Sequence, residues 1–430
     1  MKVLIVGGGG REHALARCLA RSKSVTEVIV APGNPGTAEI ARNIPLTVDD
    51  DDGIIAFAKA ERVGLVVIGP EAPLVRGMAD RLRAVGIPVF GPSAAGAELE
   101  GSKAFAKDLM NHNGVPTANF RSFQTAASAL GYLSGPLDFP VVVKASGLAA
   151  GKGVIICPDL MRAEDAVKKM MVERAFGQSG ATVVIESFLA GEELSVHSLC
   201  DGKTFHTLPT SQDHKRVFDR DEGPNTGGMG AFSPGRRGAG KELDTIEELV
   251  VVPTMHALRK AGRPFRGVLF TGLMMTRSGP RVLEYNVRFG DPETQVILPR
   301  MLGDLGIILL ACAEGRLAEL DPAQLGVDPS PVVTVVLTSA GYPGPFEVGK
   351  PISGLREAAK VPGVWIDHAG TALRGDSLVT SGGRVLCVTA KGATLEEARK
   401  QAYAAASLIQ FEGVHYRKDI GLKAGASSSS

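Results

Sequence analysis

The sequence predicts a mixed fold, with α/β architecture followed by α+β architecture. Its 430 residues correspond to about three domains at roughly 150 residues each. Residues 1–101 alternate short β-branched apolar runs with helical stretches, a pattern typical of a parallel sheet with helices on both faces. Farther along, short strands flank glycine loops, and residues 277–280 are typical of a hairpin turn, which favours antiparallel pairing.

We expect residues 1–101 to form an open parallel α/β domain. Its apolar runs predict strands at residues 3–6, 28–31, 65–69 and 89–91. The stretches between them predict helices at residues 11–20, 53–60 and 78–85.

Residues 102–325 are expected to form a largely antiparallel α+β domain. Helices are predicted at 102–112 and 161–172, and strands at 141–145, 154–157, 183–186, 193–199, 268–276 and 281–288. Residues 330–423 are expected to form a small α+β domain, with strands at 332–339 and 384–390 and a closing helix at 394–409. The small polar tail, 424–430, is expected to be disordered.

Charge and composition exclude several classes of protein. The 47 basic and 46 acidic residues give a formal charge of +1, which argues against a nucleic-acid or membrane-surface partner. The longest apolar stretch, around residues 305–313, is far shorter than the ~20 residues of a membrane span. The five cysteines form no C-x-x-C pair, so we expect buried core thiols and a cytoplasmic location instead of a zinc site or disulfides.

A first glycine loop, residues 7–10, lies between a predicted strand and a predicted helix. Backbone N–H groups at such a helix start bind anions, so Gly8, Gly9 and Gly10 are candidates to hold a phosphate. A dinucleotide site is disfavoured, because Glu12 or His13 replaces the third small residue and no acid ends the second strand. A plain tight turn remains an alternative.

A second glycine loop separates the strands at 141–145 and 154–157. It is not a Walker loop, because no Ser or Thr follows Lys152 and a strand follows instead of a helix. A mobile loop of this kind can fold over a polyphosphate and donate N–H groups, while Lys144 and Lys152 add positive charge. The alternative is a glycine-rich hairpin that binds nothing.

The segment 183–196 is a candidate to bind the adenine and ribose of a nucleotide. A strand ends near Glu186, so exposed backbone there is placed to bind an adenine, and Glu193 is placed to accept from ribose hydroxyls. A surface turn with solvated acids is the alternative.

The segment 281–293 suggests a metal site. Alternate residues of a strand share a face, so Glu284, Asn286 and Arg288 point the same way while Tyr285 and Val287 pack behind. A carboxylate and an amide oxygen suit a hard cation held partly by phosphates, with Arg288 beside it for an anionic group. Plain solvent-facing residues are the alternative.

Residues 211–217 and 223–231 form a long polar stretch that is either functional or disordered. Lys215 and Arg216 suit phosphate or carboxylate binding, and Asp213 suits an ammonium group. His214 is a candidate general base by its ordinary pKa.

Eight segments together carry a family resemblance. They are residues 9–14, 31–34, 69–74, 147–154, 212–216, 223–231, 288–293 and 368–371. In this order they resemble the glycinamide ribonucleotide synthetases, or phosphoribosylamine–glycine ligases, of the ATP-grasp superfamily. The resemblance extends over nearly the whole chain, to about residue 423, and implies a central ATP-grasp domain at 102–325 with a flap subdomain at about 117–190.

The resemblance implies an activity and its ligands. Members of this family join glycine to 5-phosphoribosylamine with ATP and Mg²⁺ or Mn²⁺, in the second step of purine synthesis, and release ADP and phosphate. The implied partners are therefore small-molecule substrates, and we expect a monomer or weak dimer. Tyr285 and Val287 differ from the Phe and Cys common in the family, and we expect no effect because both should face the core.

The resemblance also implies roles for individual residues. Those matching nucleotide contacts are Lys103, Lys144, Gly147, Gly151, Lys152, Gly153, Glu186, Phe188 and Glu193. Those matching substrate contacts are Gly8, Gly9, Gly10, Lys215, Arg216, Asn225, Thr226 and Asp291. Glu284 and Asn286 match the metal ligands, and Arg288, Lys144 and Asp213 are the candidate catalytic residues. The strand before the metal strand carries no acid, so ligands of a second metal are not identified.

Three other functions compete with this interpretation. Another ATP-grasp ligase, such as a carboxylase acting on a different carboxylate, would lack the segments at 212–216 and 225–230. A nucleotide-dependent oxidoreductase is weakened by the missing glycine and acid. A non-catalytic nucleotide-binding module is disfavoured by the presence of Lys144, Glu284 and Asn286.

Overall fold

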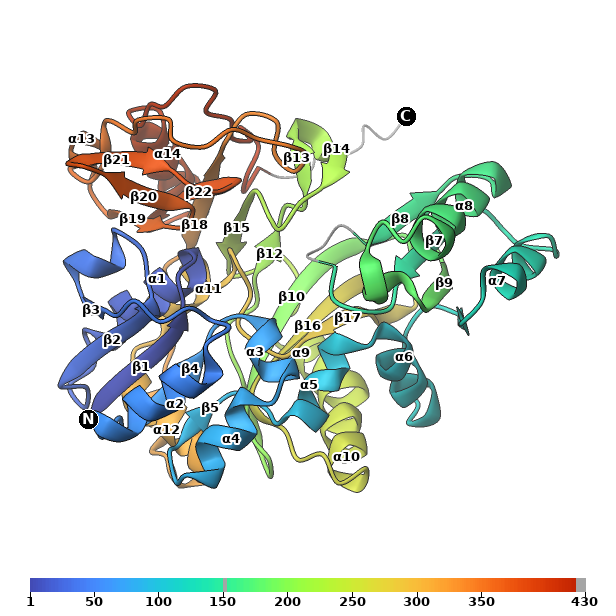
Figure 1. Cartoon of the computed structure of the whole chain (residues 1–430), viewed down its shortest axis with the longest axis horizontal. Helices are drawn as coiled ribbons and strands as arrows, with labels where there is room; N and C mark the ends of the chain where they lie inside the picture. The colour runs from blue at the N-terminus through green and yellow to red at the C-terminus, as the bar shows by residue number, and fades with distance from the viewer. Residues whose placement is uncertain (150–152, 423–430) are drawn as a thin grey trace.

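The computed structural model describes residues 1–149 and 153–422 and shows three parts (Figure 1). A parallel-sheet domain, an antiparallel central region and a smaller C-terminal α+β domain confirm the predicted fold class. Among the described residues, no helix is long and apolar enough to cross a membrane.

The N-terminal sheet is five-stranded and parallel, in the order β3-β2-β1-β4-β5. Its strands are β1 (Lys2–Gly7), β2 (Glu27–Pro32), β3 (Arg42–Asn43), β4 (Leu65–Ile68) and β5 (Val89–Phe90). Its helices are α1 (Gly10–Leu19), α2 (Asp51–Ala60), α3 (Glu71–Val75), α4 (Met78–Ala84) and α5 (Ala94–Gly101). The four predicted strands and three predicted helices are confirmed. The two-residue β3 and the helices α3 and α5 were not predicted, because they are short and carry no clear apolar period.

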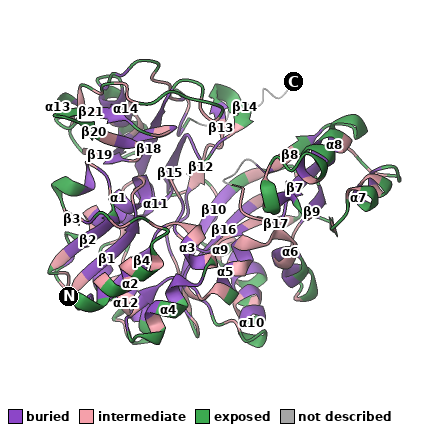
Figure 2. Ribbon diagram, in the orientation of Figure 1, coloured by how far each residue is buried: buried purple, intermediate pink, exposed green. Residues whose placement is uncertain are grey.

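A shared core joins this domain to the central region. The middle strand β1 is buried on both faces, and its side chains alternate between two clusters. Leu4 and Val6 pack in one cluster with Leu194 and Val196 of the central sheet, while Ile5 packs in the other. The buried strands meet near the middle of the molecule (Figure 2). The two domains are therefore held by common apolar contacts, which fixes the residues at their boundary.

A separate lobe projects to the right in Figure 1 and has its own core. Its antiparallel sheet, in the order β6-β9-β7-β8, contains β6 (Phe120–Phe123), β7 (Val141–Ala145), β8 (Val154–Cys157) and β9 (Val183–Ser187). The helices α6 (Lys103–His112), α7 (Ala126–Leu133) and α8 (Leu160–Val167) accompany it. The helix predicted at 161–172 continues past α8 as a π-helical turn, Lys168–Val172.

The central sheet is antiparallel, in the order β11-β10-β16-β17. Its strands are β10 (Glu192–Asp201), β11 (Phe205–Thr207), β16 (Arg266–Thr276) and β17 (Gly279–Asn286). The helices α9 (Lys241–Ile246), α10 (Val252–Lys260), α11 (Thr294–Ile297) and α12 (Leu305–Glu314) belong to this region. The strand predicted at 281–288 ends earlier, at Asn286, so Arg288 lies just beyond it.

The third sheet, in the order β12-β15-β18-β22-β19, combines two regions of sequence. Its C-terminal strands are β18 (Val332–Thr338), β19 (Val364–His368) and β22 (Arg384–Lys391), accompanied by α13 (Leu355–Ala358), α14 (Leu395–Ala406) and the hairpin of β20 (Thr371–Arg374) and β21 (Ser377–Thr380). The strands β12 (Gln212–Asp213) and β15 (Gly230–Ser233) come from the polar stretch. β12 pairs with β15, and β15 pairs with β18. Between β12 and β15 in sequence lies the hairpin of β13 (Arg216–Phe218) and β14 (Glu222–Asn225). This pairing anchors the predicted substrate loop.

The five cysteines are free thiols. Cys157, Cys200, Cys312 and Cys387 are buried as predicted, whereas Cys18, near the end of α1, is half-buried.

Candidate active site

Three segments distant in sequence meet at the boundary between the domains. They are the first glycine loop, the polar stretch and the segment that follows β17. Arg11 Nη1 donates to the carbonyl oxygen of Phe289 at 3.0 Å, and a Cβ added at Gly10 would lie 2.8 Å from Gln295 Nε2. A Cβ at Gly228 would lie 2.8 Å from Asp213 Oδ1, so side chains of the other segments pack directly against these two glycines. The structure thus brings most of the predicted site residues together.

A buried cluster of two lysines and one glutamate lies beneath the second glycine loop. Glu186 on β9 is 3% exposed, and its Oε2 accepts from Lys107 Nζ at 2.8 Å and from Lys144 Nζ at 3.0 Å. Lys144 also donates to the carbonyl oxygen of Leu283 at 3.1 Å. Burial lowers the pKa of Lys107 to about 8. Two cations against one anion leave net positive charge, as a phosphate site requires, and Glu186 contacts these lysines directly.

Lys107 is absent from the residues predicted from sequence. It lies one helical turn after Lys103 on α6, and residues four apart share a helix face. That spacing was the available signal.

The loop itself is only partly described. Lys103 Nζ donates to the carbonyl oxygen of Gly147 at 3.2 Å, and burial lowers its pKa. A Cβ at Gly147 would lie 2.7 Å from Ser179 Cα, so glycine is required there for close approach. Gly153 lies next to β8, whereas Gly151 and Lys152 fall outside the described residues. Phe188, just after β9, is exposed, as an adenine contact needs to be.

Glu284 and Asn286 lie on β17 as predicted and bring a carboxylate and an amide oxygen to the same strand. Lys215 Nζ is 3.2 Å from Glu284 Oε1 and 3.4 Å from Glu193 Oε2. Lys215, with Lys144 and Lys103, lowers the pKa of Glu284 to about 2, so this carboxylate is ionised at neutral pH. An ionised carboxylate and an amide oxygen fit Mg²⁺ or Mn²⁺ that takes its other ligands from phosphates. Among residues 1–149 and 153–422, no cluster of three or more His, Cys, Asp or Glu forms a metal cage.

Arg288 is held by carboxylates of the N-terminal domain. Its Nε is 3.3 Å from Glu71 Oε2, and its Nη2 is 3.1 Å from Glu100 Oε1 and 3.0 Å from Asn286 Oδ1. Glu100 also accepts from the backbone N–H of Val287 at 2.7 Å. Burial lowers the pKa of Arg288, but Glu100 and Glu71 outweigh it and raise the pKa above its ordinary value. Both acids are absent from the residues predicted from sequence, although Glu71 lies in the segment 69–74.

Two acids, Asp213 and Glu293, form a pair near Lys215 and Arg288. Asp213 Oδ1 is buried and, within the described part of the chain, has no hydrogen-bond partner. Burial raises the pKa of Asp213 well above its ordinary value, and Glu293 raises it further. Burial also raises the pKa of Glu293, which accepts from Ser195 Oγ at 3.2 Å. An unpaired buried carboxylate next to a second acid is suited to an ammonium ligand.

His214, the candidate general base, does not have the ordinary pKa on which that prediction rested. Burial, followed by Arg417, lowers its pKa to about 4, so the imidazole is neutral at pH 7. Its backbone N–H donates to the carbonyl oxygen of Gly230 at 2.9 Å, which joins it to the third sheet.

The other predicted residues of the polar stretch, Arg216, Asn225 and Thr226, differ in how close they lie to the site. Thr226 fixes Lys215, because its N–H and Oγ1 both donate to the Lys215 carbonyl oxygen, at 2.7 and 2.9 Å. Arg216 and Asn225 pair across β13 and β14, and Arg216 Nη1 donates to the Gly223 carbonyl oxygen at 2.6 Å. No contact of the described residues joins Arg216 to Glu284 or Asp213.

Asp291 is paired with Arg384, which reaches across from the C-terminal domain at 3.1 Å. Burial raises the pKa of Asp291, but Arg384 and Arg11 outweigh it, so the pKa lies below its ordinary value. Arg384 is also absent from the residues predicted from sequence, because it lies in none of the recognised motifs.

The first glycine loop already contacts a carboxylate. Glu12 Oε2 accepts from the N–H of Gly9 at 2.7 Å, and Glu12 Oε1 accepts from Arg11 Nε at the same distance. A Cβ at Gly8 would lie 2.6 Å from the Gly33 carbonyl oxygen, so this glycine allows β1 and β2 to turn close together. The Gly9 amide, part of the predicted phosphate site, is therefore used within the protein.

These features define an ATP-grasp protein. Lysines lie under a glycine hairpin and face an antiparallel sheet, which carries the carboxylate of Glu284 and the amide oxygen of Asn286. The phosphoribosylglycinamide synthetase model for the ATP-grasp (A) domain matches residues 101–294, the N-domain model matches 1–100 and the C-domain model matches 332–423. The chain therefore belongs to the phosphoribosylglycinamide synthetase family. The predicted family is confirmed, and the oxidoreductase alternative is removed.

Named relatives and solved structures agree with this assignment. The chain is 47% identical over 427 residues to the phosphoribosylamine–glycine ligase of Rhodopirellula baltica, with 98% of this chain and 97% of the relative covered. A crystal structure of the Thermotoga maritima phosphoribosylamine–glycine ligase is 36% identical, with a TM-score of 0.81 over 98% of this chain and 100% of that chain. The biotin carboxylase domain of a Hydrogenobacter thermophilus 2-oxoglutarate carboxylase shares the fold, with 16% identity and a TM-score of 0.73 over 96% and 91% of the two chains.

Replacing Lys107 tests the electrostatics of the buried lysine cluster. The pKa of about 8 in the folded protein lies below the ordinary 10.5, so the unfolded chain binds more protons between these pH values. The free energy of unfolding should therefore rise with pH across this window, by up to roughly 3 kcal/mol from this group. We expect Lys107→Met to flatten that rise, measured by urea unfolding at pH 7.5, 9 and 10.

Lys169→Met is the matched control, because Lys169 is exposed on the same lobe. Equal pH slopes for Lys107→Met and the wild-type protein would contradict the assignment.

Proposed function

We propose that the protein joins glycine to 5-phosphoribosylamine with hydrolysis of ATP, which gives glycinamide ribonucleotide, ADP and phosphate. The single observation that carries this proposal is the unpaired buried carboxylate of Asp213, which lies beside Glu293 and two residues before Lys215, whose Nζ contacts Glu284. Family membership supplies the substrate class. We further propose a cytoplasmic location and a monomer or weak dimer, as expected from the sequence.

The first step is transfer of a phosphoryl group to glycine. A carboxylate oxygen of glycine attacks the γ-phosphorus of ATP, and the bond to the β–γ bridging oxygen breaks, so ADP leaves and glycyl phosphate forms. Such transfers depend on positioning and on neutralisation of charge. Lys103, Lys144 and Lys107 supply positive charge under the glycine hairpin, and Arg288 is directed at the transferred group.

A metal ion contributes charge neutralisation at this site when it is bound. Glu284 and Asn286 are the residues that would hold Mg²⁺ or Mn²⁺, together with oxygens of the nucleotide phosphates. Within the protein, the lysine at position 215 keeps Glu284 ionised and therefore ready to accept a cation.

The second step forms the amide bond. The amine nitrogen of phosphoribosylamine attacks the acyl carbon of glycyl phosphate, the carbon–oxygen bond to phosphate breaks, and the nitrogen loses a proton. We propose that Asp213 and Glu293 hold the glycine ammonium group, because they are buried acids with unused acceptor capacity. Exclusion of water from the site protects the acyl phosphate from hydrolysis.

The sugar phosphate is assigned to the boundary with the N-terminal domain. Gly9 and Gly10 lie against Asp291, whereas Gly8 lies against the backbone of Gly33. Glu12 already accepts from the Gly9 amide, so we propose that Gly8 and Gly10 line the substrate while Arg11 and Glu12 fix the loop. Lys215 and Thr226 complete the boundary from the polar stretch.

Replacing Glu284 tests the proposed metal site. We expect Glu284→Ala to abolish ADP formation with ATP, Mg²⁺, glycine and 5-phosphoribosylamine prepared in situ, while ATP still binds measurably. The lysine cluster remains in this variant and keeps its contact with phosphates. Glu192→Ala, which removes an acid from β10 of the same sheet, is the matched control. Near-normal turnover of Glu284→Ala would overturn the metal assignment.

Replacing Asp213 tests the ammonium site. Burial and the charge of Glu293 raise the pKa of Asp213, so the unliganded carboxyl holds its proton more strongly than an ordinary aspartate, and an ammonium ligand favours the carboxylate. Glycine binding should therefore release a proton, measured by calorimetry at pH 7 in two buffers of different ionisation enthalpy with a non-hydrolysable ATP analogue present.

We expect Asp213→Asn to lose this release and to weaken glycine binding by at least about tenfold. Asp244→Asn, at an exposed acid on α9, is the control. Unchanged proton release in Asp213→Asn would refute this role.

A further inference from the structure

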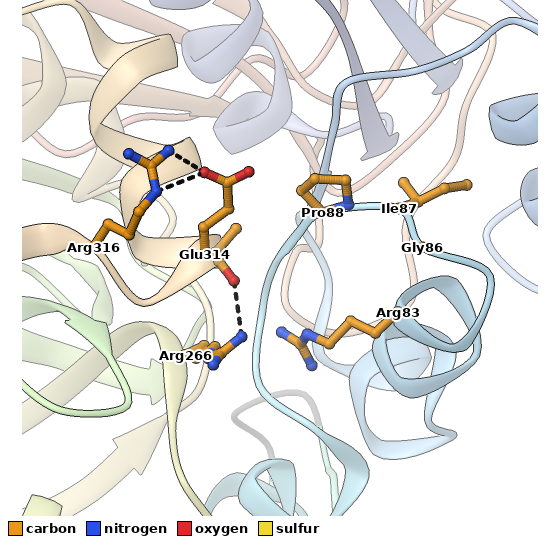
Figure 3. A pocket seen from close by; sticks show the side chains of 8 residues that line it. Arg83, Gly86, Ile87, Pro88, Arg266, Glu314 and Arg316 are labelled. Carbon is orange, nitrogen blue, oxygen red and sulfur yellow. Dashed lines mark hydrogen bonds and ion pairs between the residues drawn. The ribbon is translucent and has the colours of Figure 1, made fainter.

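A second pocket, of about 570 Å³, lies between the N-terminal and central domains. One wall is the end of α4 and the turn before β5, and the other is the start of β16 and the end of α12 (Figure 3). Its lining residues are Arg83, Gly86, Ile87, Pro88, Arg266, Ala313, Glu314 and Arg316. None of them belongs to the site described above.

Two arginines from different domains meet in this pocket without a carboxylate partner. The guanidinium groups of Arg83 and Arg266 point toward one another from opposite walls (Figure 3). Neither forms an ion pair with any residue in the described part of the chain. Burial, followed by repulsion from Arg266, lowers the pKa of Arg83. Half-buried guanidinium groups are normally paired, so two unpaired ones facing each other are unfavourable without an anion.

The nearby carboxylates accept hydrogen bonds from groups other than Arg83 and Arg266. Glu314 Oε2 accepts from Arg316 Nε at 3.0 Å on the outer rim, which leaves that pair neutral. The carboxylate of Asp201 accepts three backbone N–H groups at 2.7–2.9 Å. Asp80, the remaining acid that acts on Arg83, accepts from a backbone N–H at 2.7 Å. None of these acids forms an ion pair with Arg83 or Arg266 in the described part of the chain, although the charge of Asp80 partly offsets that of Arg83.

Capping of backbone carbonyls explains only part of this arrangement. Arg266 Nη1 donates to the Ala313 carbonyl oxygen at 3.1 Å, near the C-terminal end of α12, where a cation is favourable. Arg83 Nη2 donates to the carbonyl oxygen of Val89 at 3.1 Å and also to that of Gly91. One nitrogen of each guanidinium is used in this way. Each guanidinium carries five donors, so several stay available, and capping alone does not require both cations in one pocket.

We propose that this pocket binds a phosphate-bearing small molecule whose phosphate lies between Arg83 and Arg266. Planar guanidinium groups bind phosphate in a bidentate manner, and two of them match its charge. The pocket is open to solvent, and its volume of about 570 Å³ leaves room for a molecule larger than a free phosphate. Pro88 offers an apolar surface to the rest of the molecule.

The site would link the two halves of the active centre. Arg266 begins β16, which pairs with the strand carrying Glu284 and Asn286. Arg83 holds the end of β5, and α5 follows with Glu100, which contacts Arg288. A ligand bound to both arginines contacts both domains, and because it binds only the folded protein, it stabilises the folded protein by mass action.

The test uses inorganic phosphate and AMP as probes of the full-length protein. We expect calorimetry at constant ionic strength to show one more bound phosphate group in the wild-type protein than in Arg83→Met/Arg266→Met. We expect each single variant to weaken this extra site by at least about tenfold. Phosphate should raise the melting temperature of the wild-type protein more than that of the double variant.

Arg259→Met is the matched control, because Arg259 is exposed on α10 and lies outside the pocket. Tighter binding of AMP than of inorganic phosphate at the extra site would identify a phosphate monoester as the ligand. Binding of inorganic phosphate alone, or equal binding by the wild-type protein and the double variant, would overturn the proposal. Phosphate bound at the active centre is retained in every variant and does not affect the comparison.

A second measurement does not depend on a variant that folds. Crystals of the wild-type protein soaked with selenate, a phosphate analogue with an anomalous signal, should show a peak between the two guanidinium groups. An active centre occupied by selenate together with a vacant Arg83–Arg266 pocket would overturn the proposal. Loss of the proposed ligase activity would leave this result unaffected, since the two sites share no residue.

Discussion

The docking of the N-terminal domain onto the central domain is the constraint on which the site depends. Arg288 follows β17 and has no partner of opposite charge on its own strand, so its position is set by Glu71 and Glu100 of the other domain. The two domains share apolar cores, which keeps these acids within hydrogen-bond distance. Glu100 also holds the Val287 N–H, so one N-terminal carboxylate fixes both the backbone and the arginine beside Asn286.

Buried charge in the site is arranged in two groups of opposite sign. Lys103, Lys107 and Lys144 outnumber Glu186 under the glycine hairpin, whereas Asp213 and Glu293 form an acidic pair on the other side. Lys215 lies between the two groups and contacts Glu284 and Glu193. Each group is costly to bury alone, and each matches one end of the proposed reactants: phosphates for the lysines and an ammonium group for the acids.

Much of this arrangement could be predicted from sequence, because local patterns carry it. Alternation along one strand placed Glu284 and Asn286 on one face, and glycine loops marked both turns. Residues that act from another domain carried no such pattern. Glu100 and Arg384 lie on a helix and a strand without motifs, and only tertiary packing brings them to Arg288 and Asp291. The strand predicted to include Arg288 ended at Asn286, because pairing with β16 stops there.

The two glycine loops look alike in sequence but differ in why they need glycine and in the charges that lie beside them. At the first, a Cβ at Gly8 meets backbone and the Gly9 amide is already bonded to Glu12, so glycine is needed mainly for packing and helix capping. At the second, Gly147 is also required for close approach, yet the lysines beneath the loop outnumber Glu186, the acid that hydrogen-bonds to two of them. Glycine content alone therefore does not distinguish a binding loop from a turn. Unbalanced buried charge beside it does, and the same criterion identifies the pocket of Arg83 and Arg266.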